Sequence, residues 1–335
     1  MYVKFVFSPY THFPIEDIVK WSVEAEKLGF DYVWLPDLNP SYDCNDTFIT
    51  LAAIALATKK VIIGPSICNP YTRHPAMIAR TIRTLYSISN GRVILGIGAG
   101  GGSALPPLCY EMWNKPIATV RDAVIAIRKL LRGEELSMES YNFRICNLQF
   151  KDKSVNVPIF IGARRPQMLT LSGKIADGVI FGSCSEKMID CSKRYVIRGL
   201  KKAGRDPSNF SIANWMYSSI SEDSDEAKEF VKPYMPAVIY REPMEILKEA
   251  GHETDVIIKI YKLMDEGKSE QATNLITDDI INDFSLTGTP EEIIKKIRRM
   301  VDLGVTHIVF GYPLGKDIEK ALKLIGNEVI PAFKE

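Results

Sequence analysis

Length, composition and charge place the chain among ordinary globular proteins. Its 335 residues can form one large domain or two smaller ones, and 46% of them are hydrophobic and 25% charged. The 42 basic and 41 acidic side chains give a formal net charge of +1, which argues against the concentrated basic face that nucleic acids and anionic membranes require. We therefore expect neither nucleic acid nor membrane as a partner.

The N-terminal segment and the cysteines predict a cytoplasmic protein. Residues 1–10 lack the charged start, long apolar core and small-residue cleavage site of a secretory signal. No apolar run reaches the ~18 residues that span a bilayer. The six cysteines show no C-x-x-C spacing, so we interpret them as reduced, semi-buried thiols rather than as disulfides or metal ligands.

Strand and helix patterns alternate from the N-terminus onward. Residues 3–7 alternate as in a strand, and residues 14–28 place apolar side chains at helical spacings until Gly29, which suits a helix end. Residues 31–35 are an apolar strand that ends at Pro36 and Asp37. The other expected elements are strands near 61–67, 92–97, 157–161, 178–182, 211–217 and 305–310, and helices near 46–58, 75–88, 116–132, 165–176, 185–203 and 289–303.

A helix–Leu-Gly–strand unit recurs along the chain. EKLGFDYVWL near the N-terminus resembles VDLGVTHIVF at residues 301–310, and the helix before the second copy opens with a capping box at Thr289 and Glu292. Such units imply parallel strands joined by helices. Eight β/α units in order along the chain predict an α/β fold, a single (β/α)8 TIM-barrel domain over residues 1–335. A doubly wound sheet is the alternative, but no strand leads into a G-x-G-x-x-G helix start.

Residues 220–288 depart from this alternation. They are charged, mostly helical in pattern and contain no good strand, so we interpret them as a helical insertion between the seventh and eighth strands. In a barrel, long loops after strands lie at the catalytic face. The insertion could cover a substrate or form a subunit contact, and a helical decoration of the surface is the equally weighted alternative.

The loops that follow the strands contain the candidate functional residues, because barrel enzymes gather their active sites there. Asp37 follows the second strand. The other loops hold SICNPYTR at 66–73, GAGGGS at 98–103, GARR at 162–165 and FGSCS at 181–185.

Three features of these loops suggest chemistry. The glycines of 96–102 expose backbone N–H groups to a phosphate or flat ring, although loop glycines are also common turn formers. Arg164 and Arg165 precede Pro166 at a helix start, which suits an anion, or else they are solvated. Asp37 could bind a hydroxyl or ring N–H or relay a proton, and capping is the alternative. No histidine pair has metal-ligand spacing, so we expect a bound cofactor to do the chemistry.

A family resemblance emerges at NPYTRHPAMIARTIRTLYSISNGRVILGIGAG, residues 69–100. This segment resembles the coenzyme F420-dependent methylenetetrahydromethanopterin reductases, within the bacterial-luciferase-like superfamily of barrels. The similarity continues through residues 113–134, 157–180, 201–208 and 286–297, which together cover nearly the whole chain outside the insertion.

The resemblance implies a luciferase-like barrel with a deazaflavin, coenzyme F420, in its mouth. It also implies a non-prolyl cis peptide bond at Ser66-Ile67 on the third strand. The positions that match cofactor contacts are Asp37, Ser66, Ile67, Asn69, Thr72, Gly98, Ala99, Gly100, Gly162 and Ala163. Arg164 and Arg165 replace small or neutral residues, and they could take the cofactor's phosphodiester or glutamate tail. Asp37 is the candidate catalytic residue.

Three departures from the family pattern concern the substrate. Val6 stands where the family has Glu on the first strand, Leu38 follows Asp37 where it has His, and Gly101 replaces an acidic residue. These changes remove polar groups that handle protons or contact the pterin, and leave the expected cofactor positions in place. The chain could therefore be a paralogue with a different substrate.

The resulting hypothesis is an F420-dependent oxidoreductase. Hydride would pass between C5 of the deazaflavin and a small organic substrate, with a methylene-tetrahydropterin as the leading candidate. An FMN-dependent luciferase-like monooxygenase and a non-catalytic F420-binding paralogue are the alternatives. By resemblance, we also expect a homo-oligomer.

Overall fold

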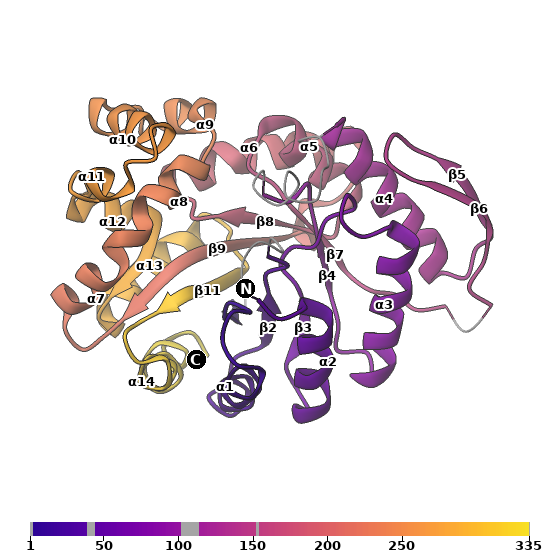
Figure 1. Cartoon of the computed structure of the whole chain (residues 1–335), viewed down its shortest axis with the longest axis horizontal. Coiled ribbons are helices and arrows are strands. Elements are labelled where there is room, and N and C mark those ends of the chain that lie inside the picture. The colour runs from indigo at the N-terminus through magenta and orange to yellow at the C-terminus, as the bar shows by residue number, and fades with distance from the viewer. Residues whose placement is uncertain (1–2, 39–43, 102–113, 152–153, 335) are drawn as a thin grey trace.

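The computed structural model describes residues 3–38, 44–101, 114–151 and 154–334. Within them, parallel strands lie side by side in the order β3-β2-β1-β11-β9-β8-β7-β4 (Figure 1). The strands are β1 (Lys4–Ser8), β2 (Tyr32–Leu35), β3 (Ile62–Pro65), β4 (Leu95–Ile97), β7 (Ile159–Gly162), β8 (Gly178–Gly182), β9 (Ser211–Ile220) and β11 (His307–Leu314).

The sheet closes on itself between its two outer strands. Isolated parallel bridges join Ile63 to Val93 and Cys68 to Ile97, and the Cys68 N–H donates to the Gly96 carbonyl at 3.0 Å. This closure excludes the doubly wound alternative, which has free edges. The predicted (β/α)8 barrel is therefore confirmed.

Helices follow the barrel strands close to the expected boundaries. They are α1 (Ile15–Lys27), α2 (Thr47–Ala57), α3 (Pro75–Ile88), α4 (Pro116–Leu131), α5 (Pro166–Ile175), α6 (Glu186–Lys202), α13 (Pro290–Asp302) and, after the last strand, α14 (Ile318–Leu324). Gly29 and Gly304 take φ of 91° and 93° just beyond α1 and α13. The capping box of Thr289 and Glu292 is present. These local signals explain why the ends of these helices could be predicted from the sequence.

The barrel interior is a closed apolar plug. Strand residues alternate in direction, so Phe5 and Phe7 face the helices while Val6 between them faces inward. The inward cluster comprises Val6, Trp34, Ile94, Phe160, Ile180, Ala213 and Val309. Because side chains fill the interior, ligands must bind at an end of the barrel.

The predicted insertion between the seventh and eighth barrel strands is present. It holds α7 (Ser224–Val231), η4 (Lys232–Tyr234), α8 (Met235–Arg241), α9 (Met244–Glu249), α10 (Asp255–Asp265), α11 (Ser269–Thr273) and α12 (Asp278–Phe284), drawn in orange in Figure 1. The expectation that 220–288 contains no strand was wrong. A short strand, β10 (Ser285–Gly288), pairs with the outer end of β9, where its four residues are buried.

A second small sheet was not expected at all. The antiparallel strands β5 (Leu136–Glu139) and β6 (Arg144–Leu148) form a hairpin between α4 and β7, outside the barrel. Only Leu136 and Ile145 of the two strands are buried, so the hydrophobic alternation is weak. In the described part of the chain, no helix is both long and apolar enough to span a membrane.

Candidate active site at the barrel mouth

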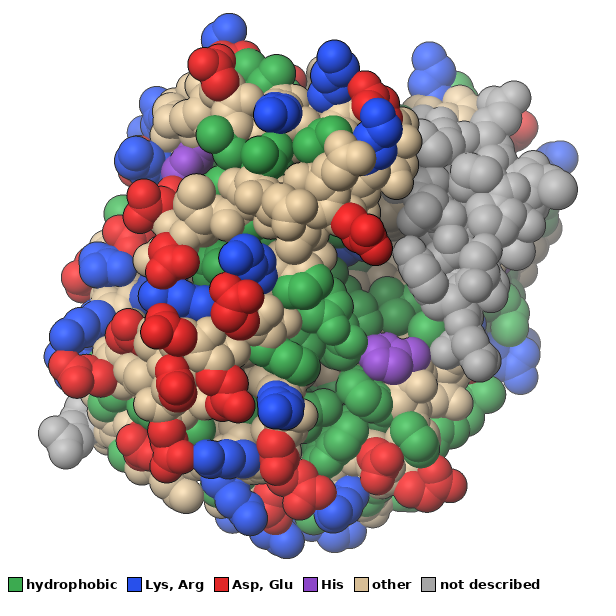
Figure 2. Space-filling model, turned by 60° about the vertical axis from the view of Figure 1, so that its left-hand side comes forward, with side chains coloured by type: hydrophobic (Ala, Val, Ile, Leu, Met, Phe, Trp, Pro, Cys, Tyr) green, Lys and Arg blue, Asp and Glu red, His purple; other side chains and the backbone are tan. Residues whose placement is uncertain are grey.

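Strands β8 and β9 run toward the left of Figure 1, and Figure 2 is turned so that this side comes forward. The face is hollowed, and hydrophobic side chains line the hollow below the insertion helices. All the sequence-predicted site residues follow barrel strands, so they lie around this end.

Asp37 forms an ion pair that the sequence analysis did not identify. Its carboxylate receives hydrogen bonds from Arg73 Nε at 3.2 Å and Arg73 Nη2 at 3.4 Å. The same guanidinium donates to Asp46 at 2.6 Å, and Asp46 caps α2. Burial raises the pKa of Asp37, while Arg73 acts in the opposite direction. Arg73 thus fixes the Asp37 carboxylate at the end of β2.

The loop after β3 has the expected backbone. The Ser66-Ile67 peptide bond is cis. Asn69 Oδ1 accepts hydrogen bonds from the Tyr71 N–H at 3.1 Å, the Thr72 N–H at 2.9 Å and the Thr72 hydroxyl at 3.2 Å. This turn orders the loop through Asn69 and Thr72. The Ser66 hydroxyl oxygen is buried and makes no hydrogen bond to any residue in the described part of the chain.

Glycines bring the loops after β3, β4 and β7 into contact. A Cβ on Gly98 or Gly162 would lie 2.3 or 2.8 Å from Ile67 Cδ1, so these two glycines make room for the Ile67 side chain. Gly100 has φ of 76° and lies beside Asn69. Ala163 is buried, and its N–H donates to the Ile180 carbonyl. Ala99 packs half-buried against the core. We call these three loops together the glycine side of the mouth.

Arg164 and Arg165 stand before α5 as expected, but both contact the insertion. Arg164 Nη1 lies 3.1 Å from Oε1 of the buried Glu242, and Arg165 pairs with the exposed Glu245 at 3.2 Å. The guanidinium of Arg164 lies against Gly182, where a Cβ would collide with it. Burial raises the pKa of Glu242 to about 7, against the opposing effect of its arginine neighbours.

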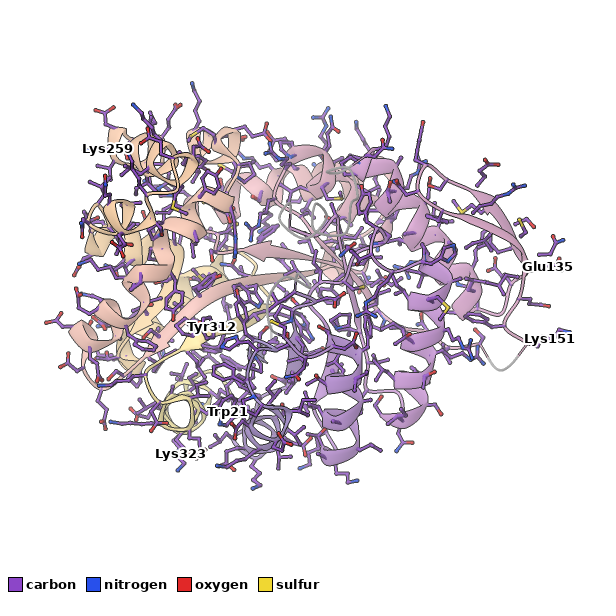
Figure 3. All side chains as sticks on the ribbon, viewed as in Figure 1. Trp21, Glu135, Lys151, Lys259, Tyr312 and Lys323 are labelled. Carbon is purple, nitrogen blue, oxygen red and sulfur yellow. The ribbon has the colours of Figure 1, made fainter. Side chains whose placement is uncertain are left out.

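An aromatic wall, which sequence reasoning missed, occupies the other side of the mouth. It consists of Tyr10, Trp215, Tyr217 and Tyr312, which belong to or follow the adjacent strands β1, β9 and β11. Tyr312 is labelled in Figure 3. Tyr10 stacks on Tyr312 with ring centroids 4.6 Å apart. The hydroxyls of Tyr10 and Tyr217 are 2.8 Å apart, and Arg241 of α8 donates to Tyr217 at 3.0 Å. The only sequence signal was a recurrence of tyrosine at strand ends.

The three residues that depart from the family pattern differ in how deeply they are buried. Val6 is fully buried in the barrel plug, so β1 brings an apolar side chain where the resemblance implies a carboxylate. Leu38 is half-buried and Gly101 is exposed. A Cβ on Gly101 would meet no atom of the described residues within 4 Å.

Other parts of the described chain offer weaker sites. No group of three or more His, Cys, Asp or Glu residues there could hold a metal ion. Cys68, Cys146, Cys184 and Cys191 are free thiols, and Cys109 lies outside the described residues. A cleft of about 610 Å³ between α6, α9 and α13 is lined mainly by charged side chains and contains none of the site residues above.

The chain is similar to proteins of established name. The model of the luciferase-like monooxygenase family matches residues 4–307. The 5,10-methylenetetrahydromethanopterin reductase of Methanolobus tindarius is 33% identical over 318 residues, which are 95% of this chain and 96% of that protein. The enzyme of the same name from Methanopyrus kandleri is 34% identical over 327 residues, 93% of both.

A solved structure extends this similarity to the fold. The coenzyme F420-dependent tetrahydromethanopterin reductase from Methanopyrus kandleri superposes with a TM-score of 0.91 at 30% identity, and the match covers 100% of each chain.

Proposed function

Because the chain belongs to the luciferase-like monooxygenase family, we propose that it is an F420-dependent oxidoreductase that moves hydride between the deazaflavin and a methylene-tetrahydropterin. The observation that carries this proposal is the similarity, over nearly the full length, to 5,10-methylenetetrahydromethanopterin reductases. The superposed F420-dependent reductase structure is 30% identical across the whole chain. The glycine side of the mouth, built from the expected residues, supports it.

The glycine side fits a flat ring joined to an acidic tail. The Ser66 hydroxyl is buried without a partner, which leaves one polar group for a ring edge. Around Gly101, among the residues that the structure describes, a Cβ would meet no atom within 4 Å. An amide backbone without side chains suits a ring that approaches closely.

The residues that would hold F420 come from four loops. They are Asp37, Ser66, Ile67, Asn69, Thr72, Gly98, Ala99, Gly100, Gly162 and Ala163. When bound, the deazaflavin supplies a hydride donor or acceptor at C5. Asp37, held by Arg73, orients the ring by accepting hydrogen bonds from it. Arg164 and Arg165 would exchange Glu242 and Glu245 for the anionic phosphodiester or glutamate tail.

Anaerobic titration with F420 and with FMN, followed by fluorescence quenching, tests the cofactor. We expect F420 to bind and FMN to bind much more weakly. The loaded protein should then oxidise reduced F420 when methylenetetrahydromethanopterin is added. FMN binding with oxygen consumption would instead identify a flavin monooxygenase. Tight F420 binding without turnover would identify the non-catalytic paralogue.

We also propose that the protein acts as a homo-oligomer in the cytoplasm, without nucleic acid or membrane partners. Helix α2 exposes Ile49 and Leu56 at 67% and 69%, and α3 beside it exposes Met77 at 54%. Burying such side chains against a second copy would stabilise a dimer. Light scattering after size exclusion should give a multiple of the chain mass, which Leu56→Lys lowers. A monomeric wild-type protein would contradict the proposal.

A further inference from the structure

On the aromatic side of the mouth, polar side chains of two barrel strands lie above the apolar plug. Along β1 and just beyond it, the alternating positions Val6, Ser8 and Tyr10 lie successively closer to the mouth. Above Val6, the Trp215 indole N–H donates to Ser8 Oγ at 2.9 Å. One step higher, the Tyr10 and Tyr217 hydroxyls lie 2.8 Å apart. Side chains from β1 and β9 thus meet twice.

A glycine between these strands allows the meeting. Strand β11 lies between β1 and β9, and Gly311 is in register with Ser8 on one side and Tyr217 on the other. A Cβ on Gly311 would lie 2.5 Å from Cζ2 of Trp215. The absence of a side chain at Gly311 therefore lets the Trp215 indole reach across to β1.

The insertion adds a cation to the pair of phenols. Arg241 Nη1 donates to the Tyr217 hydroxyl at 3.0 Å. Burial raises the pKa of Tyr10 well above its usual value, Tyr217 adds to that effect, and Arg241 opposes both. A guanidinium beside a phenol stabilises the phenolate that remains after a proton leaves. Tyr10 also stacks on Tyr312, which fixes the ring.

The proposed reaction needs a proton donor, and β1 supplies no carboxyl group for that role. In a methylene-tetrahydropterin the reacting carbon bridges two nitrogens, and one carbon–nitrogen bond must break before hydride adds. Protonation of that nitrogen makes it a leaving group. Val6 has no acidic group, and the Asp37 carboxylate, which follows the neighbouring strand β2, is held in an ion pair by Arg73.

We propose that Tyr10, with Tyr217 and Arg241 behind it, is the proton donor of this reaction, an inference that rests on the proposed function. The Tyr10 O–H bond breaks as the new N–H bond forms. The carbon–nitrogen electron pair stays on the departing nitrogen. Reduced F420 would supply the hydride that adds to the carbon and, as it is oxidised, the proton that restores the Tyr10 phenol through Tyr217.

The test uses the full-length protein loaded with reduced F420 under anaerobic conditions, with methylenetetrahydromethanopterin as substrate and F420 absorbance as the signal. Tyr10→Phe should lower kcat about 100-fold, and Tyr217→Phe about tenfold because the Tyr10 hydroxyl remains. KM and F420 affinity should stay within about twofold of wild type. The solvent deuterium isotope effect on kcat should increase in Tyr10→Phe, which a purely structural change would not cause.

Tyr234→Phe is the matched control. The Tyr234 hydroxyl also joins the insertion to the barrel, through Tyr312 at 3.1 Å, and its loss should leave kcat unchanged. Arg241→Met is a second probe should Tyr217→Phe fold poorly, and it should lower kcat about tenfold. If the wild type is active and the Tyr10 and Tyr217 variants have the same kcat as Tyr234→Phe, the assignment of Tyr10 as proton donor is wrong, while the proposed function stands. A wild type without turnover would overturn the proposed function and this inference together.

Discussion

The two sides of the barrel mouth are built by different means. The glycine side is shaped by main chain: Gly98 and Gly162 make room for Ile67, and Asn69 closes a turn of its own loop. The aromatic wall consists of large side chains from three strands, tied to the insertion by Arg241. The side that matches the family pattern depends on main-chain conformation and on positions without side chains. The wall depends on contacts between large side chains, so it can adapt to another substrate while the cofactor loops stay the same.

The largest expected effect concerns the buried Glu242 carboxyl of the insertion, beside Arg164. Glu242 has its pKa raised by burial from 4.5 to about 7, so wild-type stability should fall as pH rises through that interval and level off above it. At pH 8 the loss should be about 3 kcal/mol. Glu242→Gln cannot ionise and should remove this loss, as measured by urea unfolding at pH 5 and pH 8.

Glu245→Gln is the control for that experiment, because its carboxylate is 51% exposed beside Arg165. Its pH dependence should match wild type. If Glu242→Gln also showed the wild-type pH dependence of stability, Glu242 would not be the group whose titration lowers stability.

At the end of β2, next to the glycine side, Asp37→Asn should act on F420 affinity rather than on stability. Loss of a charge-assisted hydrogen bond to the cofactor should weaken F420 binding by about 2 kcal/mol, or roughly 30-fold, in fluorescence titration. Asp46→Asn is the control, because Asp46 shares Arg73 and asparagine caps a helix equally well. Equal affinities in the two variants would remove Asp37 from the cofactor site.

A smaller effect tests the main-chain origin of the glycine side. Gly100→Ala places a Cβ at φ of 76°, 3.3 Å from Asn69, and should cost about 1.5 kcal/mol in urea unfolding. Gly101→Ala in the same loop has no positive φ, and its Cβ would meet no atom of the described residues within 4 Å, so it should be neutral or slightly stabilising. Similar stabilities for both variants would show that this loop tolerates side chains generally.

The smallest effect belongs to the aromatic wall. Ser8→Ala removes the acceptor of the Trp215 indole N–H and should destabilise the protein by about 1 kcal/mol. Ser137→Ala, which removes an exposed hydroxyl paired with Asn147, should have no measurable effect. Thermal unfolding of both variants makes the comparison, and unchanged stability of Ser8→Ala would mean that the indole finds water instead.

Most of the barrel was predictable because its signals are local. Apolar periodicity, the glycines after α1 and α13 and the capping box at Thr289 each act within a few residues. The β5–β6 hairpin was missed because its strands are mostly exposed. Strand β10 was missed because its four buried residues directly follow a helix and only pair with β9 at long range.

The candidate site was predictable only as a set of loops. The strand-end rule located Asp37, the glycines and Arg164, but not what they contact. Arg73 lies 36 residues from Asp37 in the sequence, and Tyr10 lies 207 from Tyr217. No short-range pattern connects such pairs. Arg164 was expected to face an anion, and in the structure that anion is a carboxylate of the insertion.

The contacts of Arg241 and Glu242 have a thermodynamic consequence. These neighbours at the end of α8 reach opposite sides of the mouth, one through Tyr217 and the other through Arg164. A ligand that draws Arg164 from Glu242 therefore acts on the same peptide segment that places the guanidinium on the phenols. We expect cofactor and substrate to bind cooperatively, each changing the affinity for the other by the same factor.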